Sequence, residues 1–235
     1  MSYLRLIFSR WCMLCAGVIF VAPAYSQDAA MRADKDASLP ADVHAESRSR
    51  LPRVQRDSLD EQGKKQFDAL VARTGGRSIA GLMGPGGLNL YSPKAAVHLS
   101  GLSNYLRYES LLNGRVREIA ILTVAREMES QFEWFAHEAV ALKEGVPPEV
   151  IDIIKHRKGV DNIAPEDAAI IQLGRQAIGE KKVAPDVFAR ARNIFGDQRL
   201  VELVLLMGSY SSIATLLTTF DVQLPPGQKP MMPAR

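Results

Sequence analysis

Two glutamates and one histidine in this chain have a spacing that allows acid/base chemistry. Glu133 and His137 are four residues apart, so on a helix their side chains share one face. A carboxylate at that spacing can accept the imidazole N–H, fix the tautomer of the ring and favour its charged form. Glu118 is predicted to lie on the preceding helix, from which a second carboxylate would complete a proton relay.

Each of these residues also has a simple structural explanation. Ser130-Gln131-Phe132-Glu133 is a capping-box pattern, which by itself accounts for the second glutamate. Glu118 could pair with Arg115 or Arg117, and a single histidine is more often structural than catalytic. A chemical role for the three therefore depends on their meeting at one place.

Two side chains near the trio are candidates for contact with a substrate. Trp134 could supply an apolar wall that tunes the acid groups. Arg126 could clamp a substrate carboxylate, although an exposed helix arginine without such a role is the commoner case. One histidine with two glutamates lacks a third nitrogen ligand, so we expect no metal site and no cofactor.

The elements that must position these residues are predicted to be helical. Apolar spacing and capping residues predict helices that begin at Ser58 and at Pro93, and further helices over about 115–128, 130–144, 148–156, 165–179, 185–196 and 197–220. No segment alternates clearly between polar and apolar residues, so the predicted fold class is all-α, a compact multi-helix bundle. The last helix is apolar nearly all round, which predicts burial at the centre or in a subunit interface. Glu202 and several serines and threonines in it argue against a membrane helix.

Residues 1–26 have the pattern of a secretory signal peptide. Arg5 and Arg10 flank a short apolar stretch, and Ala24-Tyr25-Ser26 is a small-x-small cleavage site. We therefore expect a secreted protein, in a bacterial periplasm, with no membrane attachment after cleavage; an uncleaved anchor is the alternative. Both cysteines of the chain, Cys12 and Cys15, lie in this segment.

The mature chain is close to neutral. Of the 29 basic and 26 acidic side chains, only two arginines lie in the signal segment, which leaves a net charge of +1. No basic stripe with interleaved aromatics is present, so nucleic acid is not an expected partner. Residues 27–57 are predicted to be a disordered lead-in, and residues 58–228 the folded domain. The glycine-rich loop 75–93 lacks the Gly-Lys-Ser/Thr of a phosphate loop, so it is either a surface connection or a loop that closes over a pocket.

In the order and spacing of short pieces, the chain resembles the carboxymuconolactone decarboxylase family, which includes the alkyl hydroperoxidase D-like proteins. The resemblance covers about residues 80–225. Its pieces are Gly84-Pro85, Ser92-Pro93, Leu112 to Glu118, Ala125 to Glu127, Glu133 to His137, Gly145 to Pro147, and Val201 to Leu203. It implies a compact helical fold and a homo-oligomer, a trimer or a hexamer, with sites near subunit contacts.

The same resemblance separates two branches of chemistry. The peroxidase branch carries Cys-x-x-Cys on the second helix, and those positions fall on Ser130 and Glu133 here. Serine and glutamate cannot cycle through a sulfenic acid and a disulfide, so a peroxiredoxin-type antioxidant role is disfavoured. The decarboxylase branch resembles Glu-x-x-x-His, which Glu133 and His137 match.

We therefore expect a cofactor-independent acid/base enzyme, decarboxylase- or isomerase-like, acting on a small carboxylated lactone or oxo acid. His137 would be the acid/base, Glu133 its orienting partner, and Glu118 a second relay or substrate-contacting group. The alternative is an oligomeric binding protein that kept the fold and lost the chemistry. The enzyme hypothesis predicts that the trio converges on an enclosed pocket, and the binding hypothesis predicts an exposed or salt-bridged trio without one.

Overall fold

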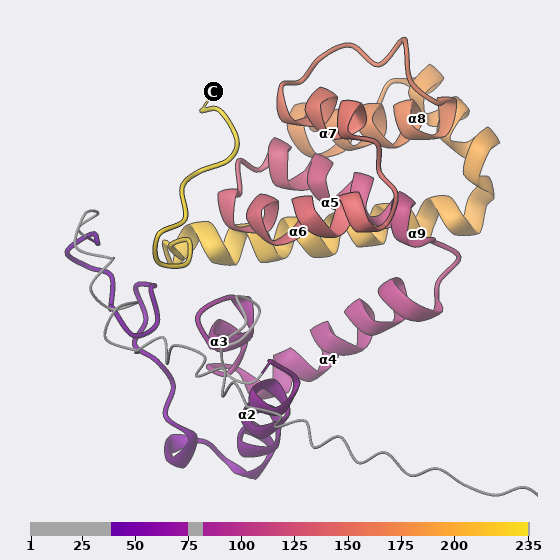
Figure 1. Ribbon diagram of the computed structural model, residues 1–235. Coiled ribbons are helices and arrows are strands. Elements are labelled where there is room, and N and C mark those ends of the chain that lie inside the picture. The colour runs from indigo at the N-terminus through magenta and orange to yellow at the C-terminus, as the bar shows by residue number, and fades with distance from the viewer. Residues whose placement is uncertain (1–38, 75–81, 235) are drawn as a thin grey trace, which may run out of the picture. The chain divides into compact units, whose positions relative to one another are not determined.

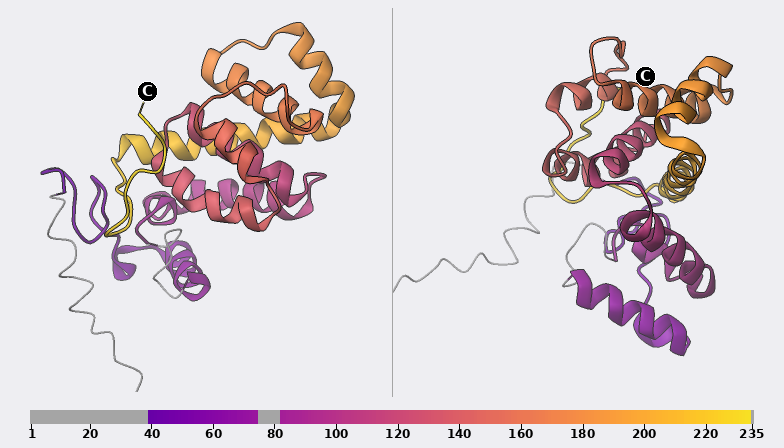
Figure 2. Two further views of the ribbon diagram at one scale, coloured as in Figure 1. Left: turned by 45° about the horizontal axis from the view of Figure 1, so that its top comes forward. Right: turned by 90° about the vertical axis from the view of Figure 1, so that its right-hand side faces the viewer.

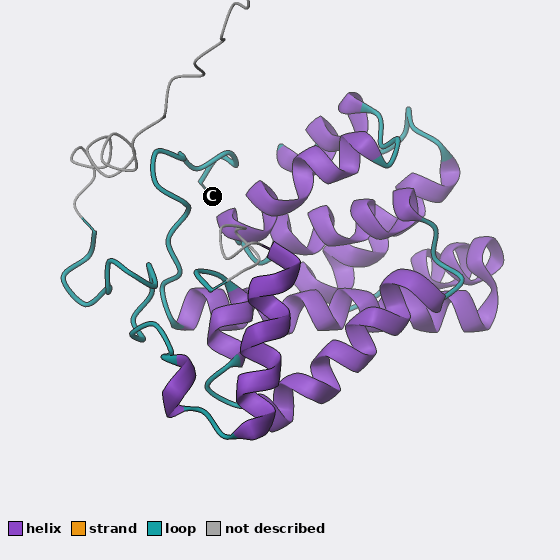
Figure 3. Cartoon of the chain, turned by 60° about the horizontal axis from the view of Figure 1, so that its bottom comes forward, coloured by secondary structure: helices purple, strands orange, loops and turns teal. Residues whose placement is uncertain are grey.

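The computed structural model describes residues 39–74 and 82–234, and this part of the chain is built from helices (Figures 1 and 3). Its α-helices are α2 (Glu61–Thr74), α3 (Pro85–Asn89), α4 (Pro93–Asn104), α5 (Gly114–Glu127), α6 (Gln131–Lys143), α7 (Pro148–Lys155), α8 (Pro165–Gly174) and α9 (Pro185–Thr219). A 3-10 turn, η2 (Arg56–Ser58), precedes α2, and π-helical turns η3 (Tyr105–Glu109) and η4 (Arg175–Glu180) extend α4 and α8. Within those ranges no strand forms beyond one isolated bridge, so the all-α prediction is confirmed. The predicted signal peptide and the first part of the glycine-rich loop lie outside the described residues.

Helix α5 is the centre of the bundle, since α6, α7, α8 and α9 all pack against it (Figure 2). Every side chain from Glu118 to Arg126 is buried. This continuous burial arises because neighbouring helices pack on several sides of α5. Burial of its aliphatic side chains supplies much of the hydrophobic stabilisation of the core.

A buried ion pair fixes the start of α5 to the start of α8. The two terminal nitrogens of Arg115 lie 2.7 Å and 2.5 Å from the two carboxylate oxygens of Asp167. Asp167 is only 1% exposed, so its charge is compensated almost entirely by this bidentate contact. Arg115 is thereby engaged away from Glu118, which removes one of the structural explanations for that glutamate.

Helix α9 contains a backbone break at Gly196, where φ is 71° and ψ is 172°. The sequence predicts two helices that meet here, and the backbone confirms the interruption. Beyond it, one face of α9 is buried in the core, while Val201, Val204 and Leu205 on the opposite face are 57%, 45% and 46% exposed. Among the described helices, α9 alone is long and apolar enough to cross a membrane. Of its apolar 18-residue stretch, 44% is buried in the bundle.

Residues 39–57 differ from the expected disordered lead-in. The Arg48 backbone carbonyl accepts a hydrogen bond from the Gln223 N–H at 2.8 Å. The side-chain Nε of Arg48 donates to the Leu224 carbonyl, also at 2.8 Å. The Arg50 N–H donates to the Phe220 carbonyl, also at 2.8 Å. The segment is polar, as its composition indicates, but the end of α9 supplies the partners that order it.

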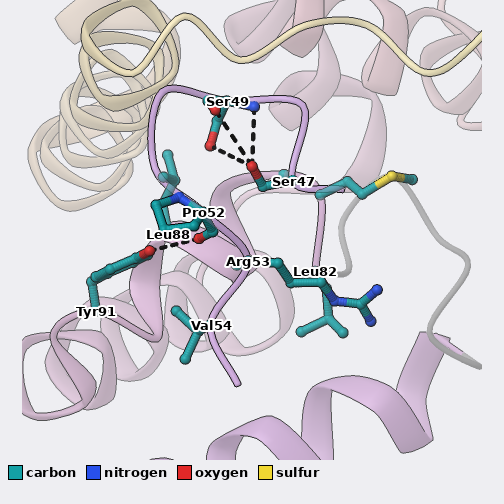
Figure 4. A pocket seen from close by; sticks show the side chains of 11 residues that line it. Ser47, Ser49, Pro52, Arg53, Val54, Leu82, Leu88 and Tyr91 are labelled. Carbon is teal, nitrogen blue, oxygen red and sulfur yellow. Dashed lines mark hydrogen bonds between the residues drawn. The ribbon is translucent and has the colours of Figure 1, made fainter. Parts of the chain in front are cut away.

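A small pocket marks where this segment packs against α3 (Figure 4). The Tyr91 hydroxyl donates to the Pro52 carbonyl at 2.6 Å, and the Ser47 hydroxyl donates to the Leu51 carbonyl at 2.6 Å. The volume inside is about 10 Å³, room for about one water molecule. We therefore interpret it as a packing junction.

Helix α2 begins later than the sequence predicts. The predicted start is Ser58, but the Ser58 hydroxyl donates to the Gln55 carbonyl at 2.7 Å. Asp60 begins the helix instead, since its Oδ1 accepts the Gly63 N–H at 2.7 Å.

The Gly196 break gives a stability prediction. Gly196→Ala should lower the free energy of unfolding by about 1–3 kcal/mol, because this backbone conformation is nearly restricted to glycine. An ideal Cβ at this position meets no atom within 4 Å, so the loss would come from the backbone alone. The measurement is urea unfolding of both proteins.

Gly208→Ala is the matched control on the same helix. Gly208 lies in the helix interior, and an added Cβ there also meets nothing within 4 Å. This variant should be more stable than the wild type, by about 0.5–1 kcal/mol. Equal effects of the two substitutions would contradict the conformational explanation.

Candidate functional site

The structure brings the three candidate acid/base residues together between α5 and α6. His137 Nδ1 lies 2.7 Å from Glu118 Oε2, and His137 Nε2 lies 3.7 Å from Glu133 Oε2. Glu118, Glu133 and His137 are 3%, 4% and 8% exposed. Each imidazole nitrogen therefore faces a carboxyl group in a site that is nearly closed to solvent.

Hydrogen bonds at the helix ends fix where α5 begins and where α6 follows it. The Asn113 side chain accepts the Val116 N–H at 2.9 Å and begins α5. After α5 ends, Glu129 takes a left-handed conformation (φ 55°), and the Ser130 N–H donates to the Ala125 carbonyl at 2.8 Å. The Ser130 hydroxyl then accepts the Glu133 N–H at 3.5 Å, which confirms the predicted helix start.

The predicted capping box is therefore only half formed. Ser130 caps the helix, but its own N–H is bonded to the Ala125 carbonyl and not to the side chain of Glu133. The Glu133 carboxyl turns inward to His137 instead. The Glu133 side chain therefore does not make the reciprocal hydrogen bond of a capping box, although its spacing from Ser130 matches that motif.

Tyr210 on α9 is a fourth member of the site that the sequence did not single out. Its ring centroid lies 5.2 Å from that of His137, and the two ring planes meet at 85°. This edge-on arrangement is a favourable aromatic contact, and Tyr210 is only 4% exposed. The signal that could have found it is a single tyrosine among the aliphatic side chains of the final helix.

Burial dominates the electrostatics of the site. Loss of solvent raises the pKa of Glu133; the charges of His137 and Arg107 oppose this effect, and Glu118 adds to it. Burial likewise raises the pKa of Tyr210, so its hydroxyl keeps its proton throughout the physiological range. The site thus combines a carboxyl group that tends to hold its proton with an imidazole bonded to a second carboxylate.

The two residues proposed to contact a substrate lie in other surroundings. Trp134 is fully buried within the hydrophobic core, and the Lys155 ammonium lies 5.4 Å from its ring centroid. Arg126 is 5% exposed, with its Nη1 3.8 Å from Glu129 Oε1. Arg126 is therefore not the exposed helix arginine that was considered, and neither side chain presents a free surface to a ligand.

Over the described ranges, no group of three or more His, Cys, Asp or Glu side chains is arranged to hold one metal ion.

The raised pKa of Glu133 predicts a pH-dependent stability. The folded protein holds this proton to higher pH than the unfolded chain does, so the contribution of Glu133 to stability is full below about pH 4 and falls as the pH rises. Glu133→Gln imitates the protonated form and cannot ionise. Its melting temperature should match that of the wild type in acid and exceed it increasingly toward neutral pH.

Thermal unfolding of both proteins from about pH 4 to pH 8 measures this effect. Glu149→Gln, at an exposed position in the first turn of α7, is the control and should show no such growing difference. A Glu133→Gln curve that stays parallel to that of the wild type would show that burial does not hold the proton.

Comparison with known proteins supports the fold and no more specific relationship. No protein-family model matches the chain, and no curated protein is significantly similar to it in sequence. Solved structures with a similar fold include two bacterial proteins. One is the alkylhydroperoxidase AhpD core of an uncharacterized peroxidase-related protein from Ralstonia eutropha, with a TM-score of 0.61 at 13% identity, covering 76% of this chain and 93% of that one.

The other is a protein of unknown function from Agrobacterium tumefaciens, described as a candidate antioxidant defence protein AhpD. Its TM-score is 0.53 at 17% identity, covering 59% of this chain and 95% of that one. At such low identity the similarity concerns the fold and not the activity. The chain therefore has the all-α fold of the AhpD-like proteins.

Proposed function

We propose that this protein is a cofactor-independent acid/base enzyme of the carboxymuconolactone decarboxylase type, acting on a small carboxylated lactone or oxo acid. The observation that carries the proposal is the buried 2.7 Å contact between His137 Nδ1 and Glu118, with Glu133 facing the other ring nitrogen. A histidine held this way can exchange a proton with a substrate carbon while its orientation stays fixed.

The distances change the roles that the sequence suggested for the two glutamates. Glu118 accepts the Nδ1–H of His137 and is the orienting group, which leaves the Nε2 lone pair on the side of Glu133. Glu133, whose pKa is raised by burial, is the proton-holding acid next to that nitrogen. Tyr210 contributes a neutral ring that keeps water from the imidazole.

A decarboxylation at this site conserves atoms and charge. The carbon–carboxylate bond of the substrate breaks, CO₂ leaves, and the electron pair passes to the adjacent carbonyl as an enolate. Glu133 transfers its proton to Nε2 of His137, the resulting imidazolium gives a proton to the carbon, and a proton from solvent restores Glu133. The electron sink belongs to the substrate, so the residues have only to position it and transfer protons.

A thiol peroxidase is the other activity suggested by the names of the similar structures. Residues 39–234 contain no cysteine, and Ser130 and Glu133 occupy the positions that the resemblance assigns to the reactive pair. Ser130 is engaged as the cap of α6, and neither residue can be oxidised reversibly. We therefore do not extend the peroxidase function to this chain.

We also propose that the protein is a homo-oligomer. The exposed face of α9 lies beside Leu111, because the buried Glu202 carboxylate accepts the Leu111 N–H at 2.9 Å and the Tyr105 hydroxyl at 2.7 Å. Leu111 is 57% exposed and Leu205 is 46% exposed. A patch of large apolar side chains of this kind fits a contact between copies of the chain.

Export to a bacterial periplasm after removal of residues 1–26 remains a proposal based on the sequence alone.

The proposed activity predicts loss of turnover when His137 is replaced. Purified mature protein is assayed for CO₂ release on a panel of carboxylated lactones and oxo acids. His137→Gln should lower kcat/KM by about 10²–10⁴-fold, the usual contribution of a positioned acid/base group. Glu118→Gln should lower kcat and shift its pH profile, because the tautomer is no longer fixed.

His156→Gln is the matched control for this assay. His156 lies on the surface after α7, with its side chain 44% exposed and 3.5 Å from Asp152, and its replacement should leave turnover unchanged. Turnover that survives in His137→Gln would contradict the mechanism. Absence of turnover over the whole panel by folded wild-type protein would favour a binding protein.

The proposed oligomer contact predicts a change in mass on charge insertion. Leu205→Lys should give a smaller species in light scattering coupled to size-exclusion chromatography, because a lysine on this patch would be desolvated in the contact. Phe188→Lys, on the first half of α9 and 49% exposed, is the control and should keep the wild-type mass. A monomeric wild type would overturn the proposal.

A further inference from the structure

A polar cavity of about 230 Å³ lies between α3, α4, η3 and α9. Serine and asparagine side chains line much of it, among them Ser100, Ser209 and Asn104, and Ile213 and Leu216 form part of an apolar wall. Because a water molecule occupies about 30 Å³ of liquid, the cavity has room for a ligand the size of about seven or eight waters.

Arg107 supplies the charge of this cavity. It is half-buried on η3, and no acidic side chain lines the cavity with it. In the described part of the chain its guanidinium forms no ion pair with a carboxylate, and it lies 5.8 Å from the centroid of the Tyr108 ring. A half-buried cation without a carboxylate partner favours an anion in the space it faces.

Helix α9 contributes residues both to the cavity and to the acid/base cluster, although none of Glu118, Glu133, His137 and Tyr210 lines the cavity. Ser209 and Ile213 line the cavity. They lie one residue before and three residues after Tyr210, whose ring packs edge-on against that of His137. The charge of Arg107 acts on both Glu133 and Tyr210, lowering the pKa of each against the effect of burial. An anion bound at Arg107 would therefore interact with a charge that also acts on Glu133 and Tyr210.

We propose that this cavity is the substrate site and that Arg107 binds the carboxylate of a small monoanionic oxo acid or carboxylated lactone. The choice of these two substrate classes rests on the proposed function, whereas the anion site rests on the cavity and the arginine. A single guanidinium, with no second cation in the lining, matches one carboxylate and not a dianion. The serine hydroxyl and asparagine amide groups of the lining would then donate hydrogen bonds to the carbonyl oxygens of the ligand. The apolar wall would contact its carbon skeleton.

The test measures binding without turnover. The probes are levulinate, an oxo acid, and 5-oxotetrahydrofuran-2-carboxylate, a carboxylated lactone, each beside its uncharged methyl ester. Titration calorimetry on the His137→Gln protein should show saturable binding of at least one acid and much weaker binding of its ester. Adding Arg107→Gln should weaken binding of the acid by about 10–100-fold, as expected for loss of a charged hydrogen bond.

Two further variants separate the site from general effects of substitution. Ser212→Leu fills the cavity and keeps Arg107, and it should also abolish binding. Arg192→Gln removes an exposed arginine of α9 that pairs with Asp197, and it should leave binding unchanged. Thermal unfolding confirms that each variant is folded.

The outcomes distinguish the two proposals. Equal affinity of Arg107→Gln for the acid, equal affinity for acid and ester, or no saturable binding of either acid would each overturn the assignment of the cavity. Arginine-dependent binding without turnover by the wild type would leave the anion site standing and overturn the proposed enzyme. Turnover with a KM that Arg107→Gln does not change would sustain the enzyme and overturn the site.

Discussion

The buried hydrogen bond between Glu118 and His137 is the interaction on which the rest of the site depends. A carboxylate removed from water is costly unless a partner compensates its charge, and the 2.7 Å contact provides that partner from another helix. The contact also limits how α5 and α6 can slide past each other. Glu133 then occupies the remaining side of the imidazole, where burial favours its protonated form.

The surrounding bundle explains how such a cluster remains in place. α5 is enclosed by four helices, and the Arg115–Asp167 pair ties its first turn to α8. On the other side Tyr210 closes the imidazole from α9. Polar groups in a rigid, closely packed interior keep one arrangement, which is the condition for proton transfer between fixed partners.

Helical periodicity and capping residues predicted the all-α class, the break at Gly196 and the start of α6 at Ser130, because these depend on local sequence. The pairing of His137 with Glu118 instead of Glu133 depends on how two helices pack, which no local pattern contains. The same reason explains why Tyr210, seventy-odd positions along the chain from His137, was missed. The order of residues 39–57 comes from partners at the end of α9, and composition alone cannot show such partners.

The position of Arg107 resolves a difficulty that burial creates. Glu118, Glu133 and His137 are each less than a tenth exposed, so a substrate cannot reach them from open solvent without a path. In the proposed assignment, Arg107 gives an anion a reason to enter the cavity, and the same charge acts on Glu133. In the proposed function, an AhpD-like fold with serine and glutamate at the positions of the reactive pair would keep a site for proton transfer, and Arg107 on a separate helical turn would attract the substrate.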